Sequence, residues 1–232
     1  VYVDIATDVV KALNMAGYIV EMPLGQACCG APATYMGDVE NAKKAAEMNL
    51  NAMEAEKYDY IVSACPTCTH ALRDYVDFFK DDPEMLKKAE ELRSKTFDFC
   101  KLVSMLGGLP DTGDGVPMKV TYHDSCHLNR YLGVTKEQRE LLKATKGVEL
   151  IEMHDCDKCC GFGGSYSVKF PEMSAPILEE KINNIVASGA DVVAVDCPGC
   201  LLQIRGGLDA RGLNNIQVKH TAQIVVEKRE KK

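Results

Sequence analysis

The chain has 232 residues, of which 46% are hydrophobic and 26% are charged, and its formal net charge is −7. This length and composition are typical of a globular protein with one large domain or two small ones, and they exclude a disordered chain. The negative charge argues against a nucleic-acid-binding or anionic-membrane-binding surface, because both need basic stripes.

The sequence contains neither a signal peptide nor an apolar run of membrane-spanning length. We therefore expect a cytoplasmic protein without a membrane span of its own, brought to a membrane only through a partner. The chain opens with VYVDIATDVV, in a helical pattern and without an initiator Met, so we also expect residues upstream of Val1.

The first half is predicted to alternate helices with strands. YIV (60–62) is short, β-branched and bounded by helix signals, which predicts a buried strand. A charged, exposed helix is expected to start near Pro83. An amphipathic helix is predicted before the strand, since four apolar residues recur there at helical spacing: Ala42, Ala46, Leu50 and Met53.

The second half shows the same alternation. MKVTYH (118–123) and DVVAV (191–195) are predicted strands, and the tail VVEKREKK is predicted to be a helix end that frays into solvent. A helix is predicted between these strands, because five apolar residues recur there at helical spacing: Ile177, Leu178, Ile182, Ile185 and Val186.

The second half can be laid over the first, which indicates an internal duplication. QACCGAP matches DKCCGFGG at an offset of 131 residues, and ACPTC matches DCPGC at 132. We predict an α/β fold built from two pseudo-equivalent copies of a parallel-strand and helix unit. The boundary is expected in GGLPDTGDGVP (107–117), which gives domains 1–110, N-terminally incomplete, and 111–232.

Eleven cysteines are many for an intracellular chain, and most of them follow one repeated pattern. In the second copy, 32 residues separate Cys126 from Cys159, and 36 separate Cys160 from Cys197. In the first copy, 35 residues separate Cys29 from Cys65, and the counterpart of Cys126 would fall before Val1. The predicted ligands of both copies are Cys28, Cys29, Cys65, Cys68, Cys126, Cys159, Cys160, Cys197 and Cys200.

The position of the Cys-x-x-Cys motifs has a physical reason. Cys65 and Cys197 follow predicted strands, and the carboxyl ends of parallel strands gather at one edge of a sheet. A helix that begins there offers free N–H groups and the positive end of its dipole to thiolates. Pro66 and Pro198 suit the first turn of such a helix, where a missing N–H costs nothing.

The adjacent cysteines favour an iron–sulfur centre over zinc. A tetrahedral zinc usually takes Cys pairs separated by two to four residues, whereas a larger multi-iron cluster can accept two neighbouring sulfurs at different irons. In extended backbone neighbouring side chains point to opposite sides, and the following Gly lets the backbone bend. Zinc as a substitute metal is the next alternative, and disulfides are the last.

Two histidines lie beside Cys126 in TYHDSCHLNR, namely His123 and His127. They are candidate proton donors near the metal, and polar residues that merely cap a strand end are the alternative. Cys100 lies in an apolar setting and is expected in the core, and Cys156 is expected to be an ordinary loop residue.

This arrangement resembles the cysteine-rich (CCG) domain family over nearly the whole chain, in two copies. CCGFGGSYSVKFPEMS and VDCPGCLLQIRGGLDARG are similar to the iron–sulfur subunits of lactate-utilisation and glycolate oxidase systems, and the family also includes the cysteine-rich component of heterodisulfide reductase. The resemblance implies one [4Fe-4S] cluster on Cys126, Cys159, Cys160, Cys197 and Cys200, and a second on Cys28, Cys29, Cys65 and Cys68.

Three functions follow as alternatives. By resemblance, the chain is an electron-transfer subunit of an oxidoreductase complex, which takes electrons from a flavin-bearing lactate- or glycolate-type dehydrogenase, or another iron–sulfur protein, and passes them to a downstream acceptor. The second alternative is a catalytic heterodisulfide or disulfide reductase in which His123 or His127 delivers a proton. The third is a zinc-stabilised interaction module. The sequence has no Walker loop or complete dinucleotide fingerprint, so any flavin is expected on the partner.

Overall fold

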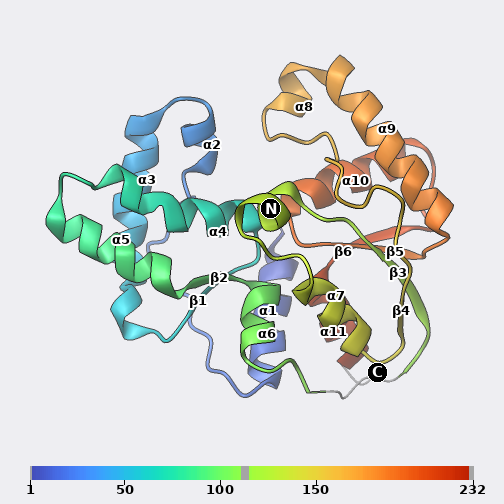
Figure 1. The fold of residues 1–232 in the computed structure, drawn as a ribbon, viewed down its shortest axis with the longest axis horizontal. Coiled ribbons are helices and arrows are strands. Elements are labelled where there is room, and N and C mark those ends of the chain that lie inside the picture. The colour runs from blue at the N-terminus through green and yellow to red at the C-terminus, as the bar shows by residue number, and fades with distance from the viewer. Residues whose placement is uncertain (1, 111–114, 230–232) are drawn as a thin grey trace. The chain divides into compact units, whose positions relative to one another are not determined.

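The computed structural model describes residues 2–110 and 115–229 of the chain. Within them helices alternate with short parallel strands (Figure 1), which confirms the predicted α/β class. The chain divides into two compact units. One is the continuous segment Val20–Phe99, and the other combines the N-terminal segment through Ile19 with the residues from Cys100 onward.

The discontinuous unit is built on a four-stranded parallel sheet of order β4-β3-β5-β6. Its strands are β3 (Met118–Tyr122), β4 (Val148–Leu150), β5 (Val192–Val195) and β6 (Gln217–His220). All four residues of β5 are buried, as predicted for a central strand of a covered parallel sheet. The predicted strand at 118–123 corresponds to β3.

Helices cover both faces of this sheet (Figure 1). On one face α9 (Pro171–Ser188) packs against α10 (Pro198–Ala210), and on the other α7 (Glu137–Ala144) packs against α11 (Thr221–Arg229). The apolar core on the α7 and α11 side joins Val120, Tyr122, Leu142, Val192, Ala194 and Ile224. The remaining helices of the unit are α1 (Val3–Met15), α6 (Phe99–Met105), the π-turn η3 (His127–Tyr131) and α8 (Tyr166–Lys169).

Helix α1 belongs to this unit although it lies in the first sequence copy, because it packs along α11. Its buried residues share one helical face: Ile5, Val9, Ala12 and Leu13. The predicted domain limits 1–110 and 111–232 follow the sequence copies and stay a prediction. Residues 111–114 of the predicted boundary lie outside the described part of the chain.

The continuous unit has a two-stranded parallel sheet of β1 (Ile61–Ser63) and β2 (Thr96–Asp98). Its helices are α2 (Ala31–Tyr35), α3 (Val39–Met53), η1 (Ala55–Lys57), α4 (Pro66–Arg73), η2 (Asp74–Phe78) and α5 (Pro83–Lys95). The predicted stripe of α3 is buried at all four positions, Ala42, Ala46, Leu50 and Met53. The charged helix begins at Pro83 as predicted, and it also buries Ala89 and Leu92 in the core of this unit.

Three expectations from the sequence are corrected by the structure. The strand predicted at 60–62 is only half-buried, because β1 has β2 as its single strand neighbour among the described residues. In α9, Ile177 and Val186 are exposed, and the long side chain of Lys181 takes a buried position instead.

The third correction concerns the charged tail. Lys228 and Arg229 are buried rather than solvated, since Lys228 Nζ donates to the Val116 carbonyl at 2.5 Å and Arg229 Nε to the Pro110 carbonyl at 2.7 Å. Residues 230–232 of the predicted tail lie outside the described residues. Of the helices that the structure describes, none combines the length and the hydropathy needed to cross a bilayer.

Candidate metal centres

The second cysteine set, Cys126, Cys159, Cys160, Cys197 and Cys200, lies at the carboxyl end of the four-stranded sheet. Strand β3 leads to Cys126, and its neighbour β5 leads to Cys197. From β3 the chain moves to β4 on one side of the sheet, and later to β5 on the other side. This reversal of direction is the place where open α/β sheets usually bind ligands.

Helix α10 presents the Cys-x-x-Cys pair as predicted. Cys197 is the extended N-cap residue of α10, Pro198 is its first helical residue, and Cys200 lies in the first turn. Both cysteines are buried. The free N–H groups and the positive dipole end of a 13-residue helix therefore stabilise negative charge on these sulfurs.

The adjacent cysteines reach the set through a bend at Gly161. Gly161 has a left-handed φ of 85°, and a Cβ there would lie 2.7 Å from the Ser174 carbonyl oxygen on α9. The Ser174 hydroxyl in turn donates to the Gly161 carbonyl at 2.8 Å. Cys160 is buried and Cys159 is exposed, yet the two thiols are hydrogen-bonded to each other. The bend that the sequence predicts after the adjacent cysteines is therefore present at Gly161.

The thiols of the second set share hydrogen bonds. Hydrogen bonds from Cys159 and Cys200 hold the pKa of Cys160 far below its ordinary value, against the opposing effect of burial. The same bonds raise the pKa of Cys159, and bonds to Cys160 and Cys197 raise the pKa of Cys200. For Cys126, burial followed by the charges of Cys197 and Cys160 raises the pKa. A positive charge that enters among the sulfurs would favour loss of the remaining protons.

His123 joins the buried part of this set. A ring nitrogen of His123 and the sulfurs of Cys160 and Cys200 all lie within 4.8 Å of one another. Neither ring nitrogen has a hydrogen-bond partner among the described residues. His127 lies at the rim, with Nδ1 3.8 Å from the Cys126 sulfur and its ring stacked on Tyr131.

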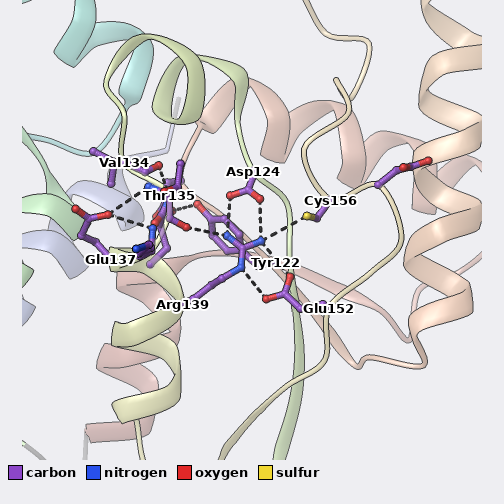
Figure 2. A network of polar contacts seen from close by, with 12 residues as sticks. Tyr122, Asp124, Val134, Thr135, Glu137, Arg139, Glu152 and Cys156 are labelled. Carbon is purple, nitrogen blue, oxygen red and sulfur yellow. Dashed lines mark hydrogen bonds and ion pairs between the residues drawn. The ribbon is translucent and has the colours of Figure 1, made fainter.

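Arg139 ties together the two loops that carry these ligands (Figure 2). Its guanidinium forms a bidentate pair with Asp124, which precedes Cys126, at 2.9 and 2.8 Å. It also donates to Glu152 at 2.6 and 3.0 Å, and to the Cys156 sulfur at 3.5 Å. The guanidinium stacks over the Tyr122 ring, 5.1 Å from its centroid. Arg139 therefore fixes the loop after β3 against the loop before Cys159.

Lys181 holds the same loop from α9. Its buried ammonium donates to the carbonyls of Asp155 and Cys156 at 2.5 and 3.2 Å. Asp155 itself has a left-handed φ of 54° and pairs with Lys158 at 2.7 Å. The buried Lys181 is thus a cation placed to offset negative charge on Cys160.

A buried carboxylate lies behind the second set. Asp196, which directly precedes Cys197, accepts hydrogen bonds from the Tyr122 hydroxyl and, at 3.5 Å, from the Cys100 thiol. His220 Nε2 lies 3.8 Å from the same carboxylate. Cys100 is fully buried, which confirms its predicted place in the core.

Replacing Arg139 with methionine is expected to destabilise the metal-free protein by about 2–3 kcal/mol. Breaking a buried ion pair costs about 3–5 kcal/mol because it strands the partner charge, and the partial exposure of Arg139 reduces that cost. Urea unfolding followed by circular dichroism measures the change. Glu152→Gln is the control, since Glu152 is 45% exposed and its loss should cost at most about 1 kcal/mol. Equal losses of stability in the two variants would contradict the role of Arg139 in holding the two loops together.

The first cysteine set, Cys28, Cys29, Cys65 and Cys68, has the same local design in the other unit. Cys65 is the N-cap residue of α4 and Pro66 its first residue, and Gly30 after the Cys pair has a left-handed φ of 80°. A hydrogen bond from Cys68 lowers the pKa of Cys29 to about 6. Bonds to Cys29 and Cys65 raise the pKa of Cys68. The hydrogen-bonding pattern of the second set therefore recurs here, with more exposed cysteines.

Asn49 and Tyr75 hold the loop of the first set in place. Asn49 on α3 is fully buried; its amide donates to the Cys28 carbonyl at 3.0 Å and to the Tyr75 hydroxyl at 2.8 Å, and its oxygen accepts from the Ala27 N–H at 2.8 Å. The Tyr75 hydroxyl donates to the Cys29 carbonyl at 3.0 Å. Both carbonyls of the adjacent cysteines are thereby fixed.

Tyr75→Phe is expected to cost about 1–2 kcal/mol of stability in the metal-free protein, because it leaves the buried Asn49 amide and the Cys29 carbonyl each short of a partner. We also expect the first set to retain less iron during desalting. The matched control is Tyr58→Phe, whose hydroxyl makes one bond to Glu21 at the surface and whose loss should fall within about 0.5 kcal/mol. Indistinguishable unfolding curves for the two variants would overturn this role of Tyr75.

The structure brings together all nine cysteines that the sequence singled out, in two sets. Sulfur-only donors suit iron–sulfur centres and zinc alike, but the five thiols of the second set exceed the four ligands of a structural zinc. Sequence reasoning missed Arg139, Lys181, Asn49 and Tyr75. Lys158, which also lies beside Cys159 in the sequence, is an exposed residue paired with Asp155 and Glu180.

Comparison with known proteins identifies curated relatives over almost the full chain. Lactate utilization protein A of Shouchella clausii is 40% identical over 228 residues, which cover 98% of this chain and 94% of that protein. Lactate utilization protein A of Bacillus subtilis is 37% identical over 217 residues, covering 93% and 90%.

Among solved structures, a hypothetical protein from Helicobacter pylori matches the whole chain with a TM-score of 0.66 at 11% identity, which shows a shared fold. The chain spans 47% of the length of that protein. The model of the cysteine-rich CCG domain matches the chain twice, at residues 2–73 and 120–205, which confirms the predicted duplication. The two matches include both adjacent cysteine pairs and both Cys-x-x-Cys motifs, so this chain is a member of the cysteine-rich (CCG) domain family.

Proposed function

We propose that this chain is an iron–sulfur electron-transfer subunit of an oxidoreductase complex. On this proposal it takes electrons from a flavin-bearing dehydrogenase of a 2-hydroxy acid, of the lactate or glycolate type, and passes them to a downstream acceptor. The relatives named for lactate utilisation support the substrate class. The expected cytoplasmic location stays a prediction.

The observation that carries the proposal is the repeated gathering of thiols at strand ends. In each set the second cysteine of the adjacent pair accepts hydrogen bonds from two other thiols, and the Cys-x-x-Cys motif begins a helix. We assign Cys126, Cys159, Cys160, Cys197 and Cys200 to one [4Fe-4S] centre, and Cys28, Cys29, Cys65 and Cys68 to another. When bound, such a centre supplies one-electron transfer.

The residues around each set prepare it for this role. Helix ends and Lys181 lower the free energy of negative charge on the sulfurs of the second set, Arg139 holds the two loops that carry them, and Asn49 with Tyr75 keeps the first set in place. Burial of Cys160, Cys197 and Cys200 limits the access of water to the second set. The role of His123 and His127 as proton donors belongs to the disulfide-reductase alternative and stays a prediction.

The test is an anaerobic preparation analysed for iron, zinc and acid-labile sulfide, with electron paramagnetic resonance spectra of the oxidised and reduced protein. We expect about four irons with matching sulfide per occupied set, and a signal that depends on redox state. The reduced protein should then deliver electrons singly to ferricenium and be reduced again by dihydro-FMN. Zinc without sulfide, persisting after anaerobic expression and failed reconstitution, would overturn the proposal in favour of a structural module. Reduction of a disulfide substrate by a low-potential dye, without flavin, would favour a disulfide reductase instead.

A further inference from the structure

We propose that His123 donates an N–H hydrogen bond to a sulfur of the second cysteine set, and thereby raises the reduction potential of the centre bound there. This inference rests on the proposed function, since it concerns the iron–sulfur centre assigned to that set. It gives His123 a positioning role toward the cofactor, which differs from delivering a proton to a substrate.

The backbone holds His123 in a fixed place. It directly follows β3, and its N–H donates to the Ala194 carbonyl of β5 at 3.0 Å, so the residue continues the sheet by one position. Its neighbours Tyr122 and Asp124 are both buried and tied by hydrogen bonds to Asp196 and Arg139. The imidazole is 1% exposed. Its orientation is therefore set by the protein interior and not by solvent.

The ring has no other use for its polar atoms in the described structure. Both nitrogens are buried and neither has a hydrogen-bond partner, sulfur included, among the described residues, while one of them lies within 4.8 Å of the sulfurs of Cys160 and Cys200. An imidazole always carries at least one N–H, and a buried donor left without an acceptor is costly. The sulfurs of Cys160 and Cys200 are thus the acceptors that lie beside that donor, and a small movement of the ring or of a sulfur completes the bond.

A hydrogen bond fits these observations better than direct ligation of iron by His123. The second set already offers five thiols, enough to hold a cluster without nitrogen. A metal-bound histidine almost always donates its second N–H to a carboxylate, a carbonyl or water. Among the described residues, no such protein partner is present for either nitrogen of His123.

The expected consequence is electrostatic. Reduction adds negative charge to the sulfurs, and a hydrogen bond stabilises the reduced form more than the oxidised one, so the potential rises. Removing the donor should shift the one-electron equilibrium about tenfold toward the oxidised form, which corresponds to a potential lower by about 59 mV.

The experiment is a redox titration of the whole chain followed by electron paramagnetic resonance, in a Cys65→Ser/Cys68→Ser background that leaves only the second centre. His123→Leu should shift the one-electron equilibrium about tenfold toward the oxidised form, which lowers the reduction potential. His123→Gln keeps an N–H and should therefore show a smaller shift. The control is His154→Leu, because the His154 side chain is 81% exposed and pairs with Asp155 at the surface. The reduction potential of the second centre in this variant should match that of the parent.

A second readout does not depend on how well the leucine variant assembles. Protein labelled with ¹⁵N-histidine, in a His127→Gln background that removes the ring beside Cys126, should show a weakly coupled nitrogen in pulsed resonance spectra, and adding His123→Gln should abolish it. A loaded variant with unchanged potential, or the absence of that coupling, overturns the inference and leaves the electron-transfer proposal intact. A strong coupling, typical of nitrogen bound to iron, also overturns it in favour of ligation. Zinc without sulfide in the parent protein overturns both proposals.

Discussion

Replacing Cys200 with serine is expected to abolish the iron–sulfur centre of the second set while the first set keeps its own. The Cys200 thiol is buried and hydrogen-bonded to Cys160 and Cys197, so it lies in the middle of the set. A serine hydroxyl is a hard donor that replaces thiolate poorly as a ligand of iron. Anaerobic reconstitution should therefore yield about four fewer irons and sulfides per chain than the parent.

The design of the chain provides a reciprocal test and a control. Cys68→Ser removes the corresponding thiol of the first set, so it should remove the other share of iron and leave the second signal unchanged. Cys156→Ser is the control, because this thiol lies three residues before Cys159 but contacts Arg139 instead of the set. If Cys156→Ser loses as much iron as Cys200→Ser, the assignment of ligands is wrong.

Gly161→Ala should be among the most destabilising single methyl additions in the chain. A left-handed backbone costs a non-glycine residue about 1–2 kcal/mol. The new methyl would also lie 2.7 Å from the Ser174 carbonyl oxygen, a backbone atom that α9 holds in place, and overpacking of this kind costs about 1–3 kcal/mol. We expect a total loss of about 3–4 kcal/mol in urea unfolding of the metal-free protein, together with weaker iron binding by Cys159 and Cys160.

Gly212→Ala separates the two contributions. Gly212 has a similar left-handed φ of 69°, but a Cβ there meets nothing within 4 Å. This variant should therefore lose only the backbone contribution of about 1–2 kcal/mol and bind iron normally. The close approach of Gly161 to α9 would be refuted by equal losses of stability at the two positions.

Much of the fold could be predicted because its signals are local. The stripe from Ala42 to Met53 has the period of a helix, and 191–195 is a β-branched run of strand length. The Pro-containing motifs predict where two helices begin, and in the structure these helices begin at Pro66 and Pro198. The cysteine sets could be proposed for a related reason, since the duplication presents the same motif twice.

The residues that position the cysteines could not be predicted, because their partners are distant in sequence. Asn49 contacts Cys28 across 21 residues and Arg139 contacts Asp124 across 15, and each looks like an ordinary polar residue of a helix. The prediction for the charged tail is wrong for a similar reason. Lys228 and Arg229 resemble a solvated end until the loops that supply their carbonyl partners are known.

The packing of α1 along α11 constrains the order in which the protein can fold during synthesis. The unit Val20–Phe99 is one continuous segment with its own core, so it can fold as soon as this segment leaves the ribosome. The other unit has to wait, because α1 is made before α11 and finds its place only when α11 has been translated. Until then the apolar face of α1 stays exposed to water, and exposed apolar surface of this kind is what chaperones bind.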